Sequence, residues 1–125
     1  MKEIMAVIRM NRMNETKRAL AKAGITSITA TGRVLGRGKG LVDQRVLNAA
    51  QQGNEYAVAL LGGGPRMMSK RLIMIVVPDD KVKLTVDTLI TVNQSGQAGD
   101  GKIFVIPCMD SFRIRTGENG EGILL

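Results

Sequence analysis

Short apolar runs, separated by polar and glycine-rich segments, predict the strands of a small sheet. Residues 2–9 form an apolar run with charged ends, which indicates a buried strand. Residues 25–35 are rich in β-branched side chains, and residues 71–77 have a continuous apolar centre, so each is expected to be a strand. A fourth strand is expected over residues 103–107.

Two segments between these runs predict helices. Asn14 is placed to cap the first, which is expected over residues 15–24 with a glycine at its end. The second is expected over residues 80–94, after Pro78 and Asp79 end the preceding strand and cap the helix. Its apolar face has helical spacing and consists of Val82, Val86, Leu89 and Ile90. The element order predicts a ferredoxin-like βαββαβ sandwich, an α+β fold in which both helices cover one face of an antiparallel sheet.

Residues 36–70 follow neither periodicity and are expected to form a long loop. The glycines of this stretch are Gly36, Gly38, Gly40, Gly53, Gly62, Gly63 and Gly64. Loops longer than about 15 residues inside a compact domain are usually functional or disordered. We expect this one to be functional, with room for a short helix or a hairpin near residues 42–61. A chain of 125 residues has the size of one domain, so residues 1–125 are expected to form a single domain.

The charge of the chain points to an anionic partner. The net charge is +7, and residues 33–71 hold seven basic and two acidic residues. Nucleic acid is disfavoured as that partner, because only Tyr56, Phe104 and Phe112 could stack on bases. The chain has no histidine, which removes the commonest general base and metal ligand and argues against an enzyme.

The sequence also predicts a cytoplasmic protein that does not enter a membrane. It contains no apolar run of about 18 residues, and the acidic Glu3 near its start is unlike a secretory signal. Cys108 is the only cysteine, so an internal disulfide is excluded, which fits a reducing compartment.

Three short segments combine glycine with cations, each beside an expected strand end. They are residues 36–40 (GRGKG), 99–102 (GDGK) and 113–117 (RIRTG). Glycine lets the backbone approach an anion closely, and arginine or lysine neutralises it. A short fifth strand is expected over residues 112–116, where alternation would place the two arginines on one face and favour a polyphosphate between them. No segment has the spacing of a known phosphate motif, and a turn with solvated charge remains the alternative for each.

Residues 99–105 (GDGKIFV) and 113–118 (RIRTGE) resemble the C-terminal signature of the P-II family of signal-transduction proteins. Residues 75–80 (IVVPDD) and the Gly36-Arg37 pair are similar to that family as well. So is the opening of the chain, through Lys2-Glu3-Ile4, Ala19-Leu20-Ala21, Gly24-Ile25-Thr26 and Thr29. The resemblance covers nearly the whole chain outside residues 41–68. It implies a trimer of ferredoxin-like subunits, with a T-loop at about residues 36–70 between strands two and three, and with ATP or ADP bound in the clefts between subunits.

The resemblance also implies which residues bind ligands. For the nucleotide they are Thr29, Gly36, Arg37, Val76, Gly99, Gly101, Lys102, Arg113 and Arg115. Lys70 matches the family lysine that pairs with a carboxylate of 2-oxoglutarate, with Gly36 and Gly38 beside it. A lysine just before a strand is a suitable point charge for a small dianion, and a solvated strand-end lysine is the alternative. The loop residues expected to bind a partner protein are Lys39, Arg45, Tyr56 and Arg66.

Gly38 departs from the family pattern. P-II proteins have a glutamine at that position, which helps to coordinate magnesium and contacts 2-oxoglutarate. Backbone groups, water or Gln44 remain as substitutes here, and Mg²⁺ remains a candidate ligand. Residues 34–39 (VLGRGK) and the longer loop are most similar to the nitrogenase-associated branch of the family. The two paralogues of that branch inhibit the dinitrogenase component together, and 2-oxoglutarate with ATP relieves the block.

We therefore expect a non-enzymatic nitrogen-signalling regulator, similar to the longer-loop paralogue, that controls nitrogenase by binding the dinitrogenase component. It would form a homotrimer or a hetero-oligomer with a second P-II-like paralogue. Regulation of an ammonium channel is the alternative target. A basic nucleic-acid-binding module and a nucleotide hydrolase are the alternatives from other classes.

Overall fold

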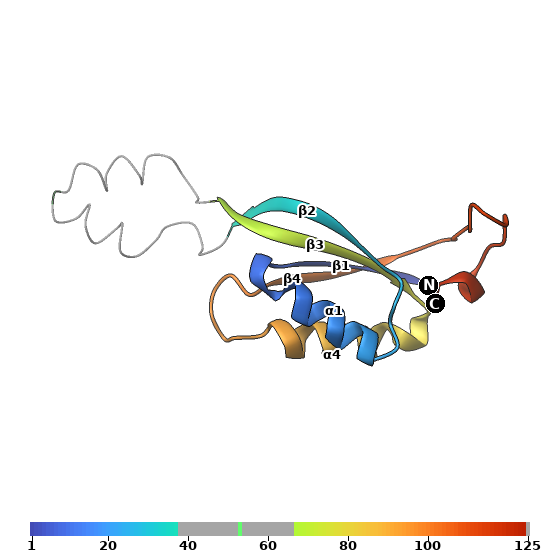
Figure 1. Cartoon of the computed structure of the whole chain (residues 1–125), viewed down its shortest axis with the longest axis horizontal. Coiled ribbons are helices and arrows are strands. Elements are labelled where there is room, and N and C mark those ends of the chain that lie inside the picture. The colour runs from blue at the N-terminus through green and yellow to red at the C-terminus, as the bar shows by residue number, and fades with distance from the viewer. Residues whose placement is uncertain (38–52, 54–66, 125) are drawn as a thin grey trace.

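A four-stranded antiparallel sheet forms the framework of the computed structural model, which describes residues 1–37, 53 and 67–124. The strands are β1 (Lys2–Arg9), β2 (Ile28–Arg37), β3 (Met67–Val77) and β4 (Gly101–Pro107), in the order β2-β3-β1-β4 (Figure 1). β1 is central and pairs with β3 on one side and with β4 on the other. The predicted ferredoxin-like α+β fold is thereby confirmed.

Both helices, α1 (Met13–Lys22) and α4 (Val82–Asn93), cover the same face of the sheet (Figure 1). Strand alternation explains this arrangement, because alternate residues of β1 and of the second half of β3 are apolar and point to that face. The buried core combines these strand residues with Met13 and Leu20 of α1, Leu89 of α4 and Ile25; its strand members are Ile4, Ala6, Ile8, Ile73, Ile75 and Val77. None of the helices among the described residues is long and apolar enough to cross a membrane.

The register places a second set of side chains on the face of the sheet that carries no helix. Arg9 of β1 lies opposite Lys70 of β3, and Val7 lies opposite Lys102 of β4. Because the helix-facing residues of β1 are Ile4, Ala6 and Ile8, the odd-numbered residues face the other way. Three cations therefore belong to one end of the open face: Arg9, Lys70 and Lys102.

The ends of several elements differ from the predictions. The first helix begins at Met13 after a 3₁₀ turn at Met10–Arg12, so Asn14 lies inside the helix and caps nothing. Asp79 does not cap the second helix with its side chain, because it lies in the 3₁₀ turn Asp79–Lys81 and its carboxylate faces the amino group of Met1 at 3.2 Å. Ile90 is 43% exposed and belongs to the rim of the helix rather than to the core.

The predicted long loop also starts later and ends earlier than expected. β2 continues to Arg37 and β3 begins at Met67, so part of residues 36–70 is a two-stranded extension of the sheet. The polar and charged residues of β3's first half concealed the strand from a search for apolar runs. The helix or hairpin expected near residues 42–61 lies outside the described residues, apart from Gly53.

The predicted fifth strand at residues 112–116 is wrong. Phe112 makes one isolated bridge to Asn119, and the residues between them form a turn. The amide of Arg113 donates to the carbonyl of Glu118 at 2.8 Å, and the amide of Gly117 donates back to the carbonyl of Arg113 at 2.7 Å. These local bonds satisfy the backbone without a neighbouring strand. Arg113 and Arg115 therefore do not share a strand face.

Candidate functional site

Lys70 connects β3 to the glycine loop that precedes β4. Its side chain is buried, with 6% exposed, and its ammonium donates to the carbonyl of Gly99 at 2.6 Å. A Cβ atom at Gly36 on the neighbouring strand would lie 3.3 Å from Cγ of Lys70, so this glycine leaves room for the lysine. Burial lowers the pKa of Lys70, the charge of Arg9 lowers it further, and Asp100 opposes both effects.

The loop between α4 and β4 is organised by Asp100. Its carboxylate accepts from the amides of Ser95 at 2.8 Å and Gly96 at 3.0 Å, and also from the Ser95 hydroxyl. These bonds, led by that of the Ser95 hydroxyl, lower the pKa of Asp100 from 3.8 to about 2. The carboxylate is therefore ionised at neutral pH and serves as the internal anchor of the loop.

Arg9 attaches this loop to the central strand. Its guanidinium lies 3.0 Å from the Asp100 carboxylate and donates to the carbonyl of Ala98 at 3.0 Å and to the Ser95 hydroxyl at 3.2 Å. The sequence prediction missed Arg9, Ser95 and Asp100 as site residues. Asp100 stands inside the GDGK segment, which could have identified it, whereas nothing local links it to Arg9, ninety-one positions earlier.

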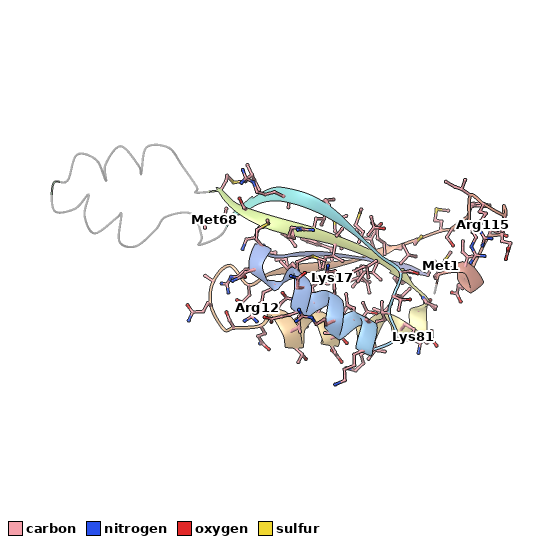
Figure 2. The ribbon with its side chains drawn as sticks, viewed as in Figure 1. Met1, Arg12, Lys17, Met68, Lys81 and Arg115 are labelled. Carbon is pink, nitrogen blue, oxygen red and sulfur yellow. The ribbon has the colours of Figure 1, made fainter. Side chains whose placement is uncertain are left out.

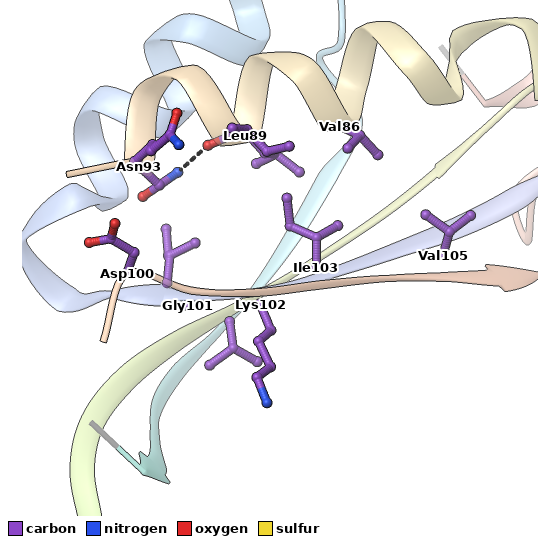
Figure 3. A pocket seen from close by; sticks show the side chains of 12 residues that line it. Val86, Leu89, Asn93, Asp100, Gly101, Lys102, Ile103 and Val105 are labelled. Atoms are coloured by element: carbon purple, nitrogen blue, oxygen red, sulfur yellow. Dashed lines mark hydrogen bonds between the residues drawn. The ribbon is translucent and has the colours of Figure 1, made fainter. Parts of the chain in front are cut away.

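Gly101 is held against the backbone of β1. It has φ +115°, and a Cβ atom there would lie 2.0 Å from the carbonyl oxygen of Val7. Gly99 also has a positive φ, of +95°. The two glycines therefore allow a close approach and a turn that side chains would prevent. Lys102 follows directly and points away from α4, onto the open face of the sheet (Figure 3).

The other predicted nucleotide residues lie elsewhere. Thr29 is exposed on β2 opposite Met74, and Val76 lies opposite Glu3, in the half of the sheet remote from Gly101. The turn that carries Arg115 follows the far end of β4 (Figure 2). Arg113, in the same turn, lies 3.5 Å from Glu118 and its side chain is 34% exposed.

The candidate site is therefore divided into two groups within one chain. The first, which we call the glycine-loop group, consists of Gly36, Lys70, Gly99, Gly101 and Lys102. The second, which we call the turn group, is defined by its separation from Gly101 rather than by mutual contact, and consists of Thr29, Val76, Arg113 and Arg115. Gly101, at the start of β4, and the turn that follows the end of β4 are about 20 Å apart, at about 3.3 Å per residue of strand. One triphosphate cannot touch both ends of this strand, so a single chain does not bring all the predicted residues together.

Several predicted residues lie outside the described part of the chain. They are Gly38, Lys39, Arg45, Tyr56, Arg66 and the side chain of Arg37. Within residues 1–37, 53 and 67–124, no cluster of three or more His, Cys, Asp or Glu residues could hold a metal ion. The prediction of Mg²⁺ gains no support from a cluster of this kind, and an ion held mainly by phosphate oxygens stays a prediction.

A groove of about 470 Å³ runs between α4 and the edge strand β4 (Figure 3). Its walls are mostly aliphatic, with Val86, Leu89, Ile103 and Val105 among the lining residues. The side chain of Lys102 points to the opposite side of the strand. The groove borders the glycine loop, but its apolar walls do not suit a polyphosphate.

Comparisons with known proteins agree with the fold described above. The family model "Nitrogen regulatory protein P-II" matches residues 1–118. "Nitrogen fixation nifHD region GlnB-like protein 2" of Methanobacterium ivanovii is 42% identical over 125 residues, covering 100% of both chains. "Nitrogen fixation nifHD1 region GlnB-like protein 2" of Methanosarcina barkeri is 46% identical over 121 residues, covering 97% of each chain. A solved structure of Arabidopsis thaliana PII bound to citrate has a TM-score of 0.72 and 30% identity, and the match covers 98% of this chain and 88% of that one.

Proposed function

This chain belongs to the nitrogen regulatory protein P-II family, and we propose that it senses ATP or ADP together with 2-oxoglutarate and controls nitrogenase. Proteins of this family are regulatory signal transducers rather than enzymes, and they act in nitrogen signalling. They generally form trimers and bind adenine nucleotides and 2-oxoglutarate. The observation that carries the proposal is the contact between the buried Lys70 and the carbonyl of Gly99, which links the effector lysine to the glycine loop.

The nucleotide binds where two subunits meet. The glycine-loop group of one subunit supplies Gly36, Gly99, Gly101 and Lys102, and the turn group of the next subunit supplies Thr29, Val76, Arg113 and Arg115. The separation of the two groups within one chain supports this division, because neither group alone surrounds a nucleotide. Arg37 adds a further cation at the end of β2.

A subunit-mixing experiment tests this composite site. Lys102→Met should weaken ATP binding from the glycine-loop side, and Arg115→Met should weaken it from the turn side. Each trimer that contains both variants should regain one intact site, because at one of its three interfaces an unmodified loop meets an unmodified turn. ATP binding that stays weak in the mixture, with mixed trimers verified by native mass spectrometry, would place the whole site within one chain and contradict the proposal.

2-Oxoglutarate binds at Lys70, with Gly36 and Gly38 beside it. The ammonium is buried against a neutral acceptor, the carbonyl of Gly99, so a carboxylate of the effector would compensate its charge. Lys70→Met should therefore abolish the effect of 2-oxoglutarate on ATP affinity while ATP still binds. Lys83→Met is the matched control, because Lys83 lies on the exposed side of α4, where it pairs with Asp87. Isothermal titration with ATP, with and without 2-oxoglutarate, measures both effects; an unchanged response in the Lys70 variant would overturn the effector site.

Control of nitrogenase is supported by the two relatives named for the nitrogen-fixation region, which match over nearly the full length of the chain. The T-loop, with Lys39, Arg45, Tyr56 and Arg66, contacts the dinitrogenase component, and a second P-II-like paralogue joins the assembly. A pull-down from nitrogen-fixing cells tests this target. Recovery of an ammonium channel in place of the nitrogenase component would contradict nitrogenase as the target and favour the alternative target.

A further inference from the structure

We propose that Arg9 and Asp100 are positioning residues for the nucleotide: they hold the glycine loop, residues 95–101, in the shape that receives phosphates. This inference deepens the proposed function and depends on it. Neither residue belongs to the set that the family resemblance suggested. Their side chains are 30% and 22% exposed, so both are partly withdrawn from solvent.

The loop has few other means of keeping its shape. Gly96, Gly99 and Gly101 all have positive φ, and glycine-rich segments lose much conformational entropy when they are ordered. The only backbone hydrogen bond recorded inside the loop runs from the Asp100 amide to the Gln97 carbonyl, and it is long at 3.4 Å. Side chains therefore provide most of the order among these residues.

The bonds of Asp100 and Arg9 close the loop from two directions. Asp100, near the end of the loop, accepts from two amides and a hydroxyl at its beginning, on Ser95 and Gly96. Arg9 crosses from β1 and bonds the loop at its start, its middle and its end, through Ser95, Ala98 and Asp100. Such a forked, charge-assisted contact favours one loop conformation over the others.

The same bonds remove an electrostatic conflict. A free carboxylate between Gly99 and Gly101 would repel the phosphates that these glycines are proposed to receive. In the structure, the carboxylate is occupied by the start of the loop and its charge is matched by Arg9. Of the three cations placed at this end of the open face, Arg9 is thus engaged by Asp100, while Lys70 and Lys102 are the ones proposed to meet the ligands.

Substitution of Asp100 distinguishes a positioning role from a purely electrostatic one, because the two roles predict opposite changes in ATP affinity. Asp100→Asn removes a negative charge beside the phosphates, so electrostatics alone would tighten ATP binding. Loss of loop order weakens it instead, by about tenfold if the competent loop falls to roughly one tenth of the population. Arg9→Met should weaken ATP binding by a similar factor, whereas Arg9→Lys should retain part of the affinity. The double variant of Arg9→Met and Asp100→Asn should bind ATP little more weakly than either single variant, because both substitutions break the same set of bonds.

The measurements are ATP affinity by titration, thermal midpoint, and hydrogen exchange of residues 95–101 without nucleotide. We expect faster exchange in the loop, weaker ATP binding and a slightly lower midpoint in the Asp100 and Arg9 variants. Lys83→Met and Asp87→Asn break an exposed ion pair on α4 and should change none of these.

Two results would overturn the inference, and they are distinguishable. Wild-type protein that binds ATP while Asp100→Asn binds it equally or more tightly, with unchanged loop exchange, would refute the positioning role and leave the proposed function standing. Wild-type protein that binds no adenine nucleotide would refute the proposed function, and the positioning role with it, whatever the exchange rates show.

Discussion

Replacement of Gly101 by alanine tests the close contact between the glycine loop and β1. Gly101 has φ +115°, and the added Cβ would lie 2.0 Å from the Val7 carbonyl oxygen and 3.1 Å from its carbon. Since Cβ atoms essentially never come within 3.0 Å of another heavy atom, one of the two backbones must move. The neighbour is backbone and cannot rotate away, so the first pair of the β1–β4 ladder, Ile8 with Gly101, has to separate.

The expected cost combines conformational strain with lost pairing. A non-glycine residue in this sparsely populated region costs about 1–3 kcal/mol, and one disrupted hydrogen bond adds about 1 kcal/mol. Gly101→Ala should therefore lower the free energy of unfolding by about 2–4 kcal/mol. Urea denaturation followed by circular dichroism, at one protein concentration for all variants, measures this change.

Two further glycines provide the controls. Gly24 has φ +84° with nothing within 4 Å of its Cβ position, so Gly24→Ala should cost only the conformational part, about 1–2 kcal/mol. Gly122 has neither a positive φ nor a close neighbour, and Gly122→Ala should change stability by less than about 0.5 kcal/mol. If Gly101→Ala proved no more destabilising than Gly24→Ala, the steric argument would be refuted.

Three further predictions concern the rest of the fold. Ile73→Ala, at a fully buried position, should destabilise the protein by about 2–5 kcal/mol, whereas Ile90→Ala, at a position 43% exposed, should cost clearly less in the same urea titration. Thr16→Val should destabilise the contact of α1 with α4, because the buried Asn93 amide then loses its 3.1 Å bond to the threonine hydroxyl; the urea midpoint should fall by more than for Thr91→Val on the exposed side of α4. Because the pKa of Asp100 is depressed in the folded state, its stabilising effect is complete above the ordinary value of 3.8 and is lost as pH falls towards about 2. The difference in urea midpoint between wild type and Asp100→Asn should accordingly shrink across that range.

The fold was predictable because its determinants are local. The alternation at Ile4, Ala6 and Ile8 defines the buried face of β1, and the apolar centre of residues 71–77 defines β3. The ends of the strands and helices were harder to predict, because the apolar pattern does not mark them. The β2–β3 extension contains arginine and lysine. It projects past the two helices (Figure 1), so neither of its faces has to be apolar in order to pack against them.

The candidate site was predictable in composition but not in arrangement. The glycines and cations of residues 99–102 were identifiable from chemistry, and Gly101 proved to need its lack of a side chain. The bond between Arg9 and Asp100 depends on strand order, which brings the end of β1 beside the start of β4. The turn at Arg113 was mistaken for a strand because apolar and charged residues alternate there, while Gly117, with φ +75°, turns the chain back.

Gly36 and Lys70 lie on the two strands that flank the long loop, and the fold brings them next to each other, with Lys70 also bonded to the glycine loop. The Gly36 Cβ position lies 3.3 Å from the Lys70 side chain, and the Lys70 ammonium bonds Gly99. A carboxylate that recruits this ammonium must share it with the Gly99 carbonyl or displace it, and either change acts on the phosphate-receiving loop and on both ends of the T-loop. By linkage, if a bound nucleotide changes the affinity of Lys70 for the carboxylate by some factor, the bound carboxylate changes the affinity for the nucleotide by the same factor. In the proposed function, the bond from Lys70 to Gly99 would therefore couple the two ligands to each other and to the segment proposed to bind the partner protein.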